Sequence, residues 1–295
     1  MDISKNIFLT GTSSGFGYHT VKQLARDGHK VFAGMRDTAT RNKERKEEFE
    51  NFGKEGNLSV KVLECDVMDT ASVEAAVKAV VDAEGRIDVL VNNAGYGVYG
   101  PLEAYDDAKA RHAFDTNVYG YVRTIRAVMP HMRKQRSGLI INVSSVLGQL
   151  GLPVMGFYNA TKFAVEGLSE ALLGEGYLFG IKVSVVEPHM FNTNFAGPSA
   201  KMMADPGETG EYEKAFRLLL EKQGNLVNPK SGPEEVARKI AWVVKQKNPP
   251  FRVPVGKNAR RDMFFAKFLD PLMLQKIAAK MYGLGDAFKK MDKSV

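Results

Sequence analysis

Tyr158 and Lys162 are a pair of residues whose types and spacing could do chemistry. They are the ends of the segment Tyr-Asn-Ala-Thr-Lys. In a helix, residues four apart lie on one face, one turn from each other. A phenol beside a fixed ammonium ionises more easily because the positive charge favours the phenolate, and such a group can give or take a proton near neutral pH. The alternative is an exposed tyrosine beside a solvated lysine.

Ser145 is a second candidate reacting group. It follows the apolar run 138–143, which predicts a strand, and it precedes Tyr158 by thirteen positions. A serine at the end of a strand that faces a tyrosine at a helix start can hydrogen-bond the same substrate oxygen as the tyrosine. Either Ser144 or Ser145 could instead cap a helix.

A glycine-rich segment near the N-terminus predicts a phosphate site. The run 6–10 indicates a buried strand, and an amphipathic pattern that stops at Gly28 indicates a helix; Gly11, Gly15 and Gly17 lie between them. In that context the glycines permit a tight turn and a close approach by a pyrophosphate, and the helix start offers unpaired N–H groups to anionic oxygens. The segment therefore favours a dinucleotide over an ordinary turn.

The end of the next predicted strand, 30–35, bears on which dinucleotide binds. In NAD-binding folds an acidic residue at this place takes the adenosine ribose hydroxyls. Here Met35 is followed by Arg36, which could pair a 2′-phosphate through charge-assisted bonds. The sequence therefore favours NADP over NAD, although Asp37 lies next door and Arg36 could be a solvated loop charge.

Two later strands, predicted at 58–65 and 87–91, also end in polar or small residues. Asp66 could accept from an adenine amino group, or it could cap the helix that starts near Ala71. In the segment 92–95, small residues let a flat ring lie close, and an asparagine can tie two strands together.

Asn117 lies in the middle of a long helical pattern over 102–136. Asparagine is a poor residue for a helix interior. A buried one could bond a distorted backbone or hold a water, and the alternative is an incidental polar residue. A further strand, 181–187, is closed by Pro188, and Thr193 follows five residues later.

The composition limits the class of protein. The chain has 295 residues, a net charge of +7 and one cysteine, Cys65. A single cysteine excludes an internal disulfide, and no signal peptide or long apolar run is visible, so we expect a cytoplasmic protein. The charge suits an anionic cofactor, an anionic membrane surface or plain solubility. No metal-ligand spacing, nucleic-acid motif or internal repeat is visible, so we predict no metal and no nucleic acid.

Over about residues 5–195 the chain resembles the short-chain dehydrogenase/reductase family, with its motifs in that family's order and spacing. The residues that carry the resemblance are Thr10–Gly17, Asn92–Gly95, Asn117, Ser145, Tyr158, Lys162, Pro188 and Thr193. The segments 31–37 and 151–158 are similar to the steroid- and retinol-dehydrogenase-like branches. The resemblance implies an α/β fold, a Rossmann-type doubly wound sheet of about seven parallel strands. We expect a single domain over 1–256, followed by a basic helical extension, 257–295.

The resemblance also implies roles. Tyr158 would be the general acid in reduction and the base in oxidation, Lys162 would lower its pKa and bond the nicotinamide ribose, and Ser145 would orient the substrate carbonyl and stabilise the oxyanion. Asn117 would hold a water in the proton relay, and Thr193 would hold the nicotinamide carboxamide. The cofactor-binding set would be Gly11, Ser13, Ser14, Gly15, Phe16, Gly17, Arg36, Asp66, Val67, Asn93, Ala94, Gly95, Tyr158, Lys162, Pro188 and Thr193.

The sequence departs from the family at Pro188-His189, where Pro-Gly is usual. His189 could reach the substrate cleft, which we expect, or point to solvent. A substrate lid is implied at about 191–229, and an apolar pocket would favour a lipophilic or alicyclic carbonyl. The candidate substrate-binding residues are Ser145, Leu147, Met155, Tyr158, His189 and Phe191, with Tyr96, Val98 and Phe195 as further apolar candidates.

The extension 257–295 is basic and rich in Met and Phe, and Pro271 divides it into two helices. We expect it to pack on its own domain; contact with an anionic membrane surface, a partner subunit or the pocket mouth are alternatives. The whole sequence predicts an NADP(H)-dependent carbonyl reductase or alcohol dehydrogenase that forms a homodimer or homotetramer. The rivals are an NAD-dependent dehydrogenase that works oxidatively, a nucleotide-sensing protein without turnover, and a structural subunit.

Overall fold

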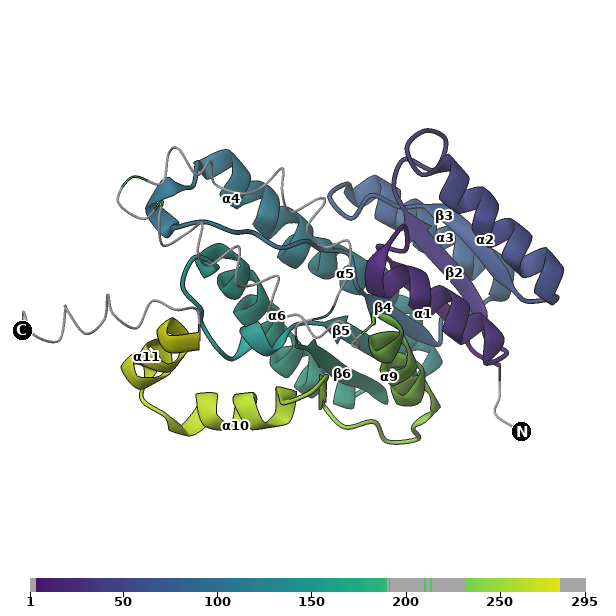
Figure 1. Cartoon of the computed structure of the whole chain (residues 1–295). Coiled ribbons are helices and arrows are strands. Elements are labelled where there is room, and N and C mark those ends of the chain that lie inside the picture. Colours follow the sequence, from purple (N-terminus) through teal and green to yellow (C-terminus); the bar gives the residue numbers. More distant parts are fainter. Residues whose placement is uncertain (1–3, 190, 192–209, 211–212, 214–231, 282–295) are drawn as a thin grey trace, which may run out of the picture.

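Seven parallel strands form one sheet in the order β3-β2-β1-β4-β5-β6-β7 (Figure 1). The structure, a computed structural model, describes residues 4–189, 191, 210, 213 and 232–281. The strands are β1 Asn6–Thr10, β2 Lys30–Met35, β3 Val60–Glu64, β4 Val89–Asn92, β5 Gly138–Val143, β6 Ile181–Pro188 and β7 Arg252–Val255. The predicted doubly wound fold with about seven parallel strands is confirmed.

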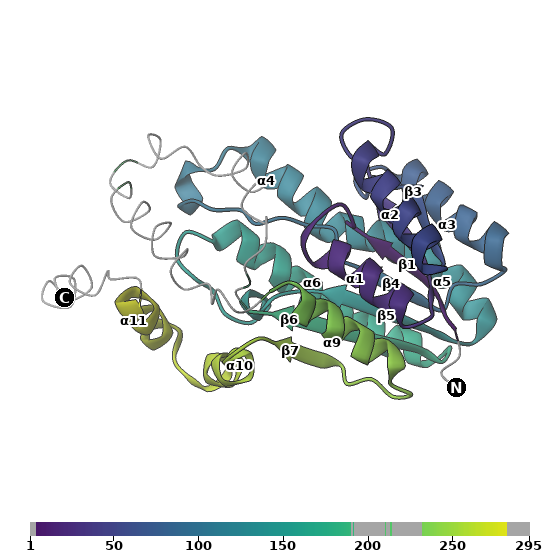
Figure 2. The same ribbon diagram turned by 45° about the vertical axis from the view of Figure 1, so that its right-hand side comes forward.

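Helices cover both faces of the sheet, so its central strands β1, β4 and β5 are buried and mostly apolar, as buried parallel strands are. The helices are α1 Gly15–Arg26, α2 Lys43–Gly56, α3 Thr70–Glu84, α4 Asp107–Phe114, α5 Gly120–Gln135, α6 Gly156–Tyr177, α9 Glu234–Lys245, α10 Ala259–Phe268 and α11 Pro271–Met281. Residues of α1, α2 and α9 share one core cluster, and residues of α3, α5 and α6 share another. Figure 2 shows α1 and α9 side by side on the first of these faces.

The strand order reverses between β1 and β4, which pair in the centre of the sheet although they are far apart in sequence. At such a point the connections leave in opposite directions and open a crevice at the carboxyl ends of the strands, where ligands bind in this class of sheet. The residues that follow β1, β2, β4 and β5 are therefore brought to one edge.

The helical pattern predicted over 102–136 starts later than expected and contains one π-helical turn. A 3₁₀ turn, η1 (Leu102–Ala104), precedes α4, and a π-helical turn, η2 (Asp115–Tyr119), joins α4 to α5. Asp106 starts α4 because its carboxylate accepts a hydrogen bond from the Lys109 N–H at 2.8 Å. The predicted helix was therefore wrong at its start, and from Asp107 to Gln135 it is continuous through the π-helical turn.

After β7 the chain forms α10 and α11, with Pro271 as the first residue of α11, where a missing N–H costs nothing. Two helices divided at Pro271 were predicted. None of the described helices is long and apolar enough to cross a membrane. Most of the predicted lid, 191–229, lies outside the described residues.

Candidate active site

The glycine loop between β1 and α1 forms one wall of a pocket at the sheet edge. Gly11 has a left-handed backbone (φ 69°), and a Cβ there would lie 2.6 Å from the Ala94 Cα. A Cβ on Gly17 would lie 2.2 Å from the Gly11 carbonyl oxygen, whereas one on Gly15 would meet nothing within 4 Å. Gly11 and Gly17 therefore permit close packing of loop, helix and β4, and Gly15 keeps the pocket side of the loop open.

The N-terminus of α1 faces this pocket, and no acidic side chain or side-chain cap offsets its positive dipole. Ser14 is the N-cap residue with an extended backbone, its side chain makes no capping hydrogen bond, and the first turn of the helix contains no acidic residue. The free N–H groups and the positive end of the helix dipole suit an anionic oxygen. This is the local property that a pyrophosphate requires.

Asn93, which follows β4, fixes the shape of the loop. Its amide Nδ2 donates to the carbonyl oxygens of Thr10 and Gly11, each at 3.0 Å. Asn92 bonds the neighbouring strand: its Nδ2 donates to Asn142 Oδ1 at 3.0 Å. The prediction that an asparagine here ties two strands together is confirmed.

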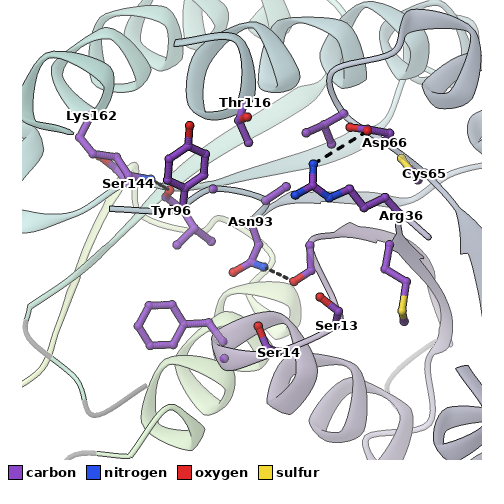
Figure 3. A pocket seen from close by; sticks show the side chains of 18 of the residues that line it. Ser13, Ser14, Arg36, Cys65, Asp66, Asn93, Tyr96, Thr116, Ser144 and Lys162 are labelled. Atoms are coloured by element: carbon purple, nitrogen blue, oxygen red, sulfur yellow. Dashed lines mark hydrogen bonds and ion pairs between the residues drawn. The ribbon is translucent and has the colours of Figure 1, made fainter. Parts of the chain in front are cut away.

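Arg36 and Arg41 line the end of the pocket that is formed by β2 and the following loop. The Arg36 guanidinium lies 4.0 Å from the Asp66 carboxylate, as Figure 3 shows. Asp37 has a left-handed backbone (φ 57°), and its carboxylate pairs with Arg41 at 3.1 Å. Asp37, the acidic residue that would favour NAD, is therefore paired with Arg41.

Asp66 does not cap the following helix, so that alternative was wrong. The N-cap of α3 is Asp69, whose carboxylate accepts from the Ala71 N–H at 2.9 Å. One oxygen of Asp66 accepts from the Met68 N–H at 2.9 Å, and the other faces Arg36. Asp66 therefore lies where the sequence placed it, in the lining of the pocket.

Tyr158 and Lys162 lie together at the opposite end of the same pocket, one turn apart on α6. Figure 3 shows Lys162 beside Ser144, with Arg36 across the pocket. Both α6 side chains are buried, and the Tyr158 hydroxyl hydrogen-bonds to Ser145. Ser145 also caps the 3₁₀ turn η3 (Val146–Gly148), because its Oγ accepts from the Leu147 N–H at 3.1 Å.

Burial controls the proton affinities of this pair. It lowers the pKa of Lys162 to about 8, against the raising effect of Glu166. It raises the pKa of Tyr158 above its ordinary value, and only the hydrogen bond with Ser145 opposes it. The Lys162 Nζ donates to the Val143 carbonyl oxygen at 2.8 Å and lies 5.7 Å from the centroid of the Tyr158 ring.

Asn117 lies within the π-helical turn and is fully buried. Its side chain accepts from the Tyr96 N–H at 3.1 Å and donates to the Tyr96 carbonyl oxygen at 2.9 Å and to Thr161 Oγ1 at 3.3 Å. Of the alternatives from the sequence, the structure therefore matches the buried asparagine that bonds backbone groups in an irregular region. It ties the segment after β4 to the helix that carries Tyr158.

The candidate substrate residues fall into two places. Leu147 and Met155 pack in one apolar cluster with Tyr158, Tyr96 and Val98. Phe191 instead belongs to the main core on the other side, where its ring contacts Phe16 at 5.7 Å between centroids.

His189 is half-buried and turns toward α10, where its Nε2 lies 3.1 Å from the Asp262 carboxylate. The sequence analysis considered only the substrate cleft and open solvent for His189, and it did not predict the contact with Asp262. Pro188 ends β6, and its carbonyl oxygen accepts a 3.4 Å hydrogen bond from Ser145. Thr193 and Phe195 lie outside the described residues.

Some polar residues near the site were missed by the sequence analysis. Glu166 and Glu187 are buried behind the Tyr158–Lys162 pair, and the Arg252 guanidinium lies 3.3 Å from Glu166 and 3.6 Å from Glu187. The one available signal was that Glu166 comes four residues after Lys162. Within the described part of the chain, no group of three or more His, Cys, Asp or Glu side chains could hold a metal ion.

The sequence was compared with known families and curated proteins. A family described as short chain dehydrogenase matches residues 5–204. A 3-ketodihydrosphingosine reductase of Bacteroides thetaiotaomicron is 39% identical over 254 residues, 85% of this chain and 87% of that protein. Human retinol dehydrogenase 8 is 36% identical over 256 residues, 84% and 80% of the two chains.

Solved structures show the same fold. A short-chain dehydrogenase from Streptomyces avermitilis has a TM-score of 0.75 and 28% identity, with 96% of this chain and 99% of that chain covered. A short-chain dehydrogenase/reductase from Burkholderia phymatum in complex with NAD has a TM-score of 0.72 and 26% identity, with 86% and 90% covered. ElxO with NADP bound has a TM-score of 0.70 and 25% identity, with 88% and 100% covered.

Proposed function

The chain belongs to the short-chain dehydrogenase family, and on that premise we propose that it is an NADP(H)-dependent oxidoreductase acting on the carbonyl or alcohol group of a lipophilic or alicyclic substrate. The observation that carries the proposal is a single pocket with Tyr158 and Lys162 at one end and two arginines, Arg36 and Arg41, at the other. Such a pocket matches a ligand with a reacting ring at one end and an anionic nucleotide at the other.

The residues present fit a dinucleotide. The uncapped start of α1 and the open side of Gly15 suit the pyrophosphate. Gly11, Ser13, Ser14, Gly15 and Phe16 line the pocket on that side. The remaining lining residues that were predicted for the cofactor are Arg36, Asp66, Val67, Asn93, Ala94, Gly95, Tyr158 and Lys162. When bound, the nicotinamide supplies hydride to a carbonyl carbon or accepts it from an alcohol.

In the reductive direction Tyr158 donates its phenolic proton to the substrate oxygen as charge develops there. Ser145, already hydrogen-bonded to that phenol, gives the same oxygen a second donor. Lys162, whose pKa is lowered to about 8, can return a proton toward the tyrosine near neutral pH. Asn117 is a positioning residue, because its amide holds the backbone of Tyr96 and not a reacting atom.

The choice of NADP rests on Arg36 and on the pairing of Asp37 with Arg41. Arg36→Ala is expected to raise the KM for NADPH about tenfold or more, because a charge-assisted bond to a phosphate is lost, and to leave the KM for NADH nearly unchanged. Steady-state rates with both cofactors measure this. Lys78→Ala, which removes an exposed charge on α3, is the control. Equal effects on both cofactors would favour the alternative, an NAD-dependent dehydrogenase that works oxidatively.

Gly17→Ala is expected to weaken NADPH binding at least about tenfold and to lower the melting temperature. The added methyl would lie 2.2 Å from the Gly11 carbonyl oxygen and 2.6 Å from Asn93 Nδ2, so the loop and its anchor would have to move. Gly174→Ala in α6, where a Cβ meets nothing within 4 Å, is the control and should be neutral or slightly stabilising. Fluorescence titration with NADPH and thermal melts measure both effects, and normal affinity in Gly17→Ala would contradict this account of the loop.

The apolar cluster around Tyr158 supports a lipophilic or alicyclic substrate. The matched relatives include proteins named for a ketodihydrosphingosine and for retinol. A panel of long-chain ketones, ketosteroids, retinoids, cyclic ketones and quinones, followed by NADPH absorbance, tests the proposal. Turnover of sugars or other polar carbonyls in preference to all of these would overturn it. A cytoplasmic location and assembly as a homodimer or homotetramer stay predictions.

A further inference from the structure

Helix α10 carries apolar side chains on two faces, one packed on the domain and one exposed. Its inner face contributes Ala259, which is 1% exposed, and Met263 to the apolar cluster that contains Tyr158. Its outer face carries Phe264 and Phe268, which are 60% and 69% exposed. A helix on a soluble surface normally presents polar residues outward. Phenylalanines in that position indicate that another apolar phase covers them.

The apolar surface continues on α11. Leu272, Met273 and Ile277 are exposed there, and Phe265 is exposed on α10. Six large apolar side chains thus project from two consecutive helices within fourteen residues, 264–277. We call these six residues the apolar patch. Figure 1 shows α10 and α11 together, away from the two faces of the sheet that the other helices cover.

The basic residues around the apolar patch indicate which kind of partner covers it. Segment 259–281 contains five basic residues (Arg260, Arg261, Lys267, Lys276 and Lys280) and two acidic ones (Asp262 and Asp270), a difference of +3. Both acids are engaged locally: Asp262 contacts His189 and Arg261, and Asp270 accepts from the Leu272 N–H at 2.8 Å. Aromatic and aliphatic residues flanked by Lys and Arg are the composition of a helix that lies in the interface of an anionic membrane.

A second copy of this chain is a poorer match for the same surface. In a two-fold dimer a surface meets its own copy, so the basic residues of one patch would face those of the other. Like charges directly opposed across an interface disfavour association. An anionic bilayer offers both the apolar phase and the opposite charge.

The position of the patch connects it to the pocket. Ala259 and Met263 on the inner face of α10 pack in the cluster that holds Leu147, Met155 and Tyr158. On α11, Gln275 Nε2 donates to the Gly151 carbonyl oxygen at 2.9 Å, which ties this helix to the loop before α6. A membrane in contact with the patch would therefore lie next to the substrate side of the pocket.

We propose that the outer faces of α10 and α11 dock on the surface of an anionic lipid bilayer, with Phe264, Phe265 and Phe268 inserted and the flanking Lys and Arg side chains against lipid phosphates. This binding is independent of turnover. Because this contact is made by side chains on the surface of two short helices and by lysines and arginines, it weakens as salt is added.

Co-sedimentation of the full chain with phosphatidylcholine vesicles, with and without phosphatidylserine, tests the proposal. The wild type should pellet with the anionic vesicles and much less with the neutral ones. Phe264→Ser/Phe268→Ser should lower the partition coefficient about tenfold or more, and Arg260→Glu/Lys267→Glu should abolish the preference for phosphatidylserine. Tyr177→Ser/Leu178→Ser, which removes two exposed apolar side chains at the end of α6, is the control and should bind as the wild type does.

Two further measurements separate loss of vesicle binding from unfolding and from self-association. Thermal melts should show that the Phe264→Ser/Phe268→Ser variant is folded, because these side chains are exposed. Light scattering over a range of protein concentrations reports self-association. The proposal is overturned if the wild type does not pellet with anionic vesicles, or if the variant pellets equally well. A dimer that the same variant dissociates, without vesicle binding, would assign the patch to a second copy.

Discussion

Replacing Tyr158 with Phe is expected to lower kcat by about 10²–10⁴-fold while the Kd for NADPH stays close to that of the wild type. The ring packs among Leu147, Met155 and Val98, so phenylalanine fills the same space and only the hydroxyl is lost. That hydroxyl is the group that Ser145 contacts and that would protonate the substrate oxygen. Steady-state kinetics and fluorescence titration with NADPH separate the two quantities.

Tyr121→Phe is the matched control, because Tyr121 is also buried and its hydroxyl donates to the Val143 carbonyl oxygen at 2.9 Å. Losing that hydrogen bond should cost about 1 kcal/mol of stability and leave kcat within about tenfold of the wild type. A Tyr158→Phe enzyme with a near-normal rate would remove Tyr158 from its proposed role. A loss of NADPH binding in parallel with kcat would point instead to damage of the pocket.

The free energy of unfolding is expected to fall as the pH rises from about 5 to 7.5, because of Glu187. This carboxyl is fully buried, and burial raises its pKa from 4.5 to about 8, with Glu166 adding to the rise and Arg252 opposing it. Between these values the folded protein holds a proton that the unfolded chain has released. The stabilisation is complete below pH 4.5 and is lost as the pH approaches 8.

The slope for one such group is at most about 1.4 kcal/mol per pH unit. Glu187→Gln should flatten the curve and stabilise the protein at pH 7.5, since the amide stays neutral in both states. Glu170→Gln is the control: Glu170 also contacts Arg252, at 2.6 Å, but its side chain is 58% exposed. Urea unfolding at a series of pH values measures the slopes. Readings stay at or below pH 7.5, because burial lowers the pKa of Lys162 to about 8 and its titration would add to the slope at higher pH.

An equal slope in the wild type and in Glu187→Gln would show that Glu187 is ionised in the folded protein throughout this range. Glu166 is the next candidate in that case, because burial also raises its pKa. The two carboxyls lie on different elements, α6 and β6, and meet at the Arg252 side chain of β7. The stability of this region is therefore a property of three segments together.

The fold and much of the candidate site could be predicted from local sequence. A run of apolar residues, a glycine turn and an amphipathic pattern specify strand, loop and helix because backbone geometry depends on near neighbours. The same holds for Tyr158 and Lys162, since a spacing of four in a helix leaves them on one face. Strand ends in a parallel sheet share one edge, so residues after β1, β2 and β4 could be assigned to one pocket in advance.

Other features depend on which segments pack together, and the spacing of residues along the sequence does not specify those contacts. Asp37 pairs with Arg41 after a residue with left-handed backbone that follows β2. His189 meets Asp262 because α10 packs on β7, the strand next to β6. The direction of the tyrosine pKa also follows from burial, which outweighs the lowering effect of the hydrogen bond with Ser145.

The amino-acid order alone was therefore enough for most of the elements, for their sequence along the chain and for the placing of Tyr158 and Lys162 one helical turn apart, because these follow from covalent spacing and helical or strand period. The packed protein was needed for the buried pair Glu166 and Glu187 and for the outward phenylalanines of α10. Burial and exposure are set by what lies against a side chain, and for these residues that neighbour comes from a remote part of the chain or, as we propose for α10, from outside it.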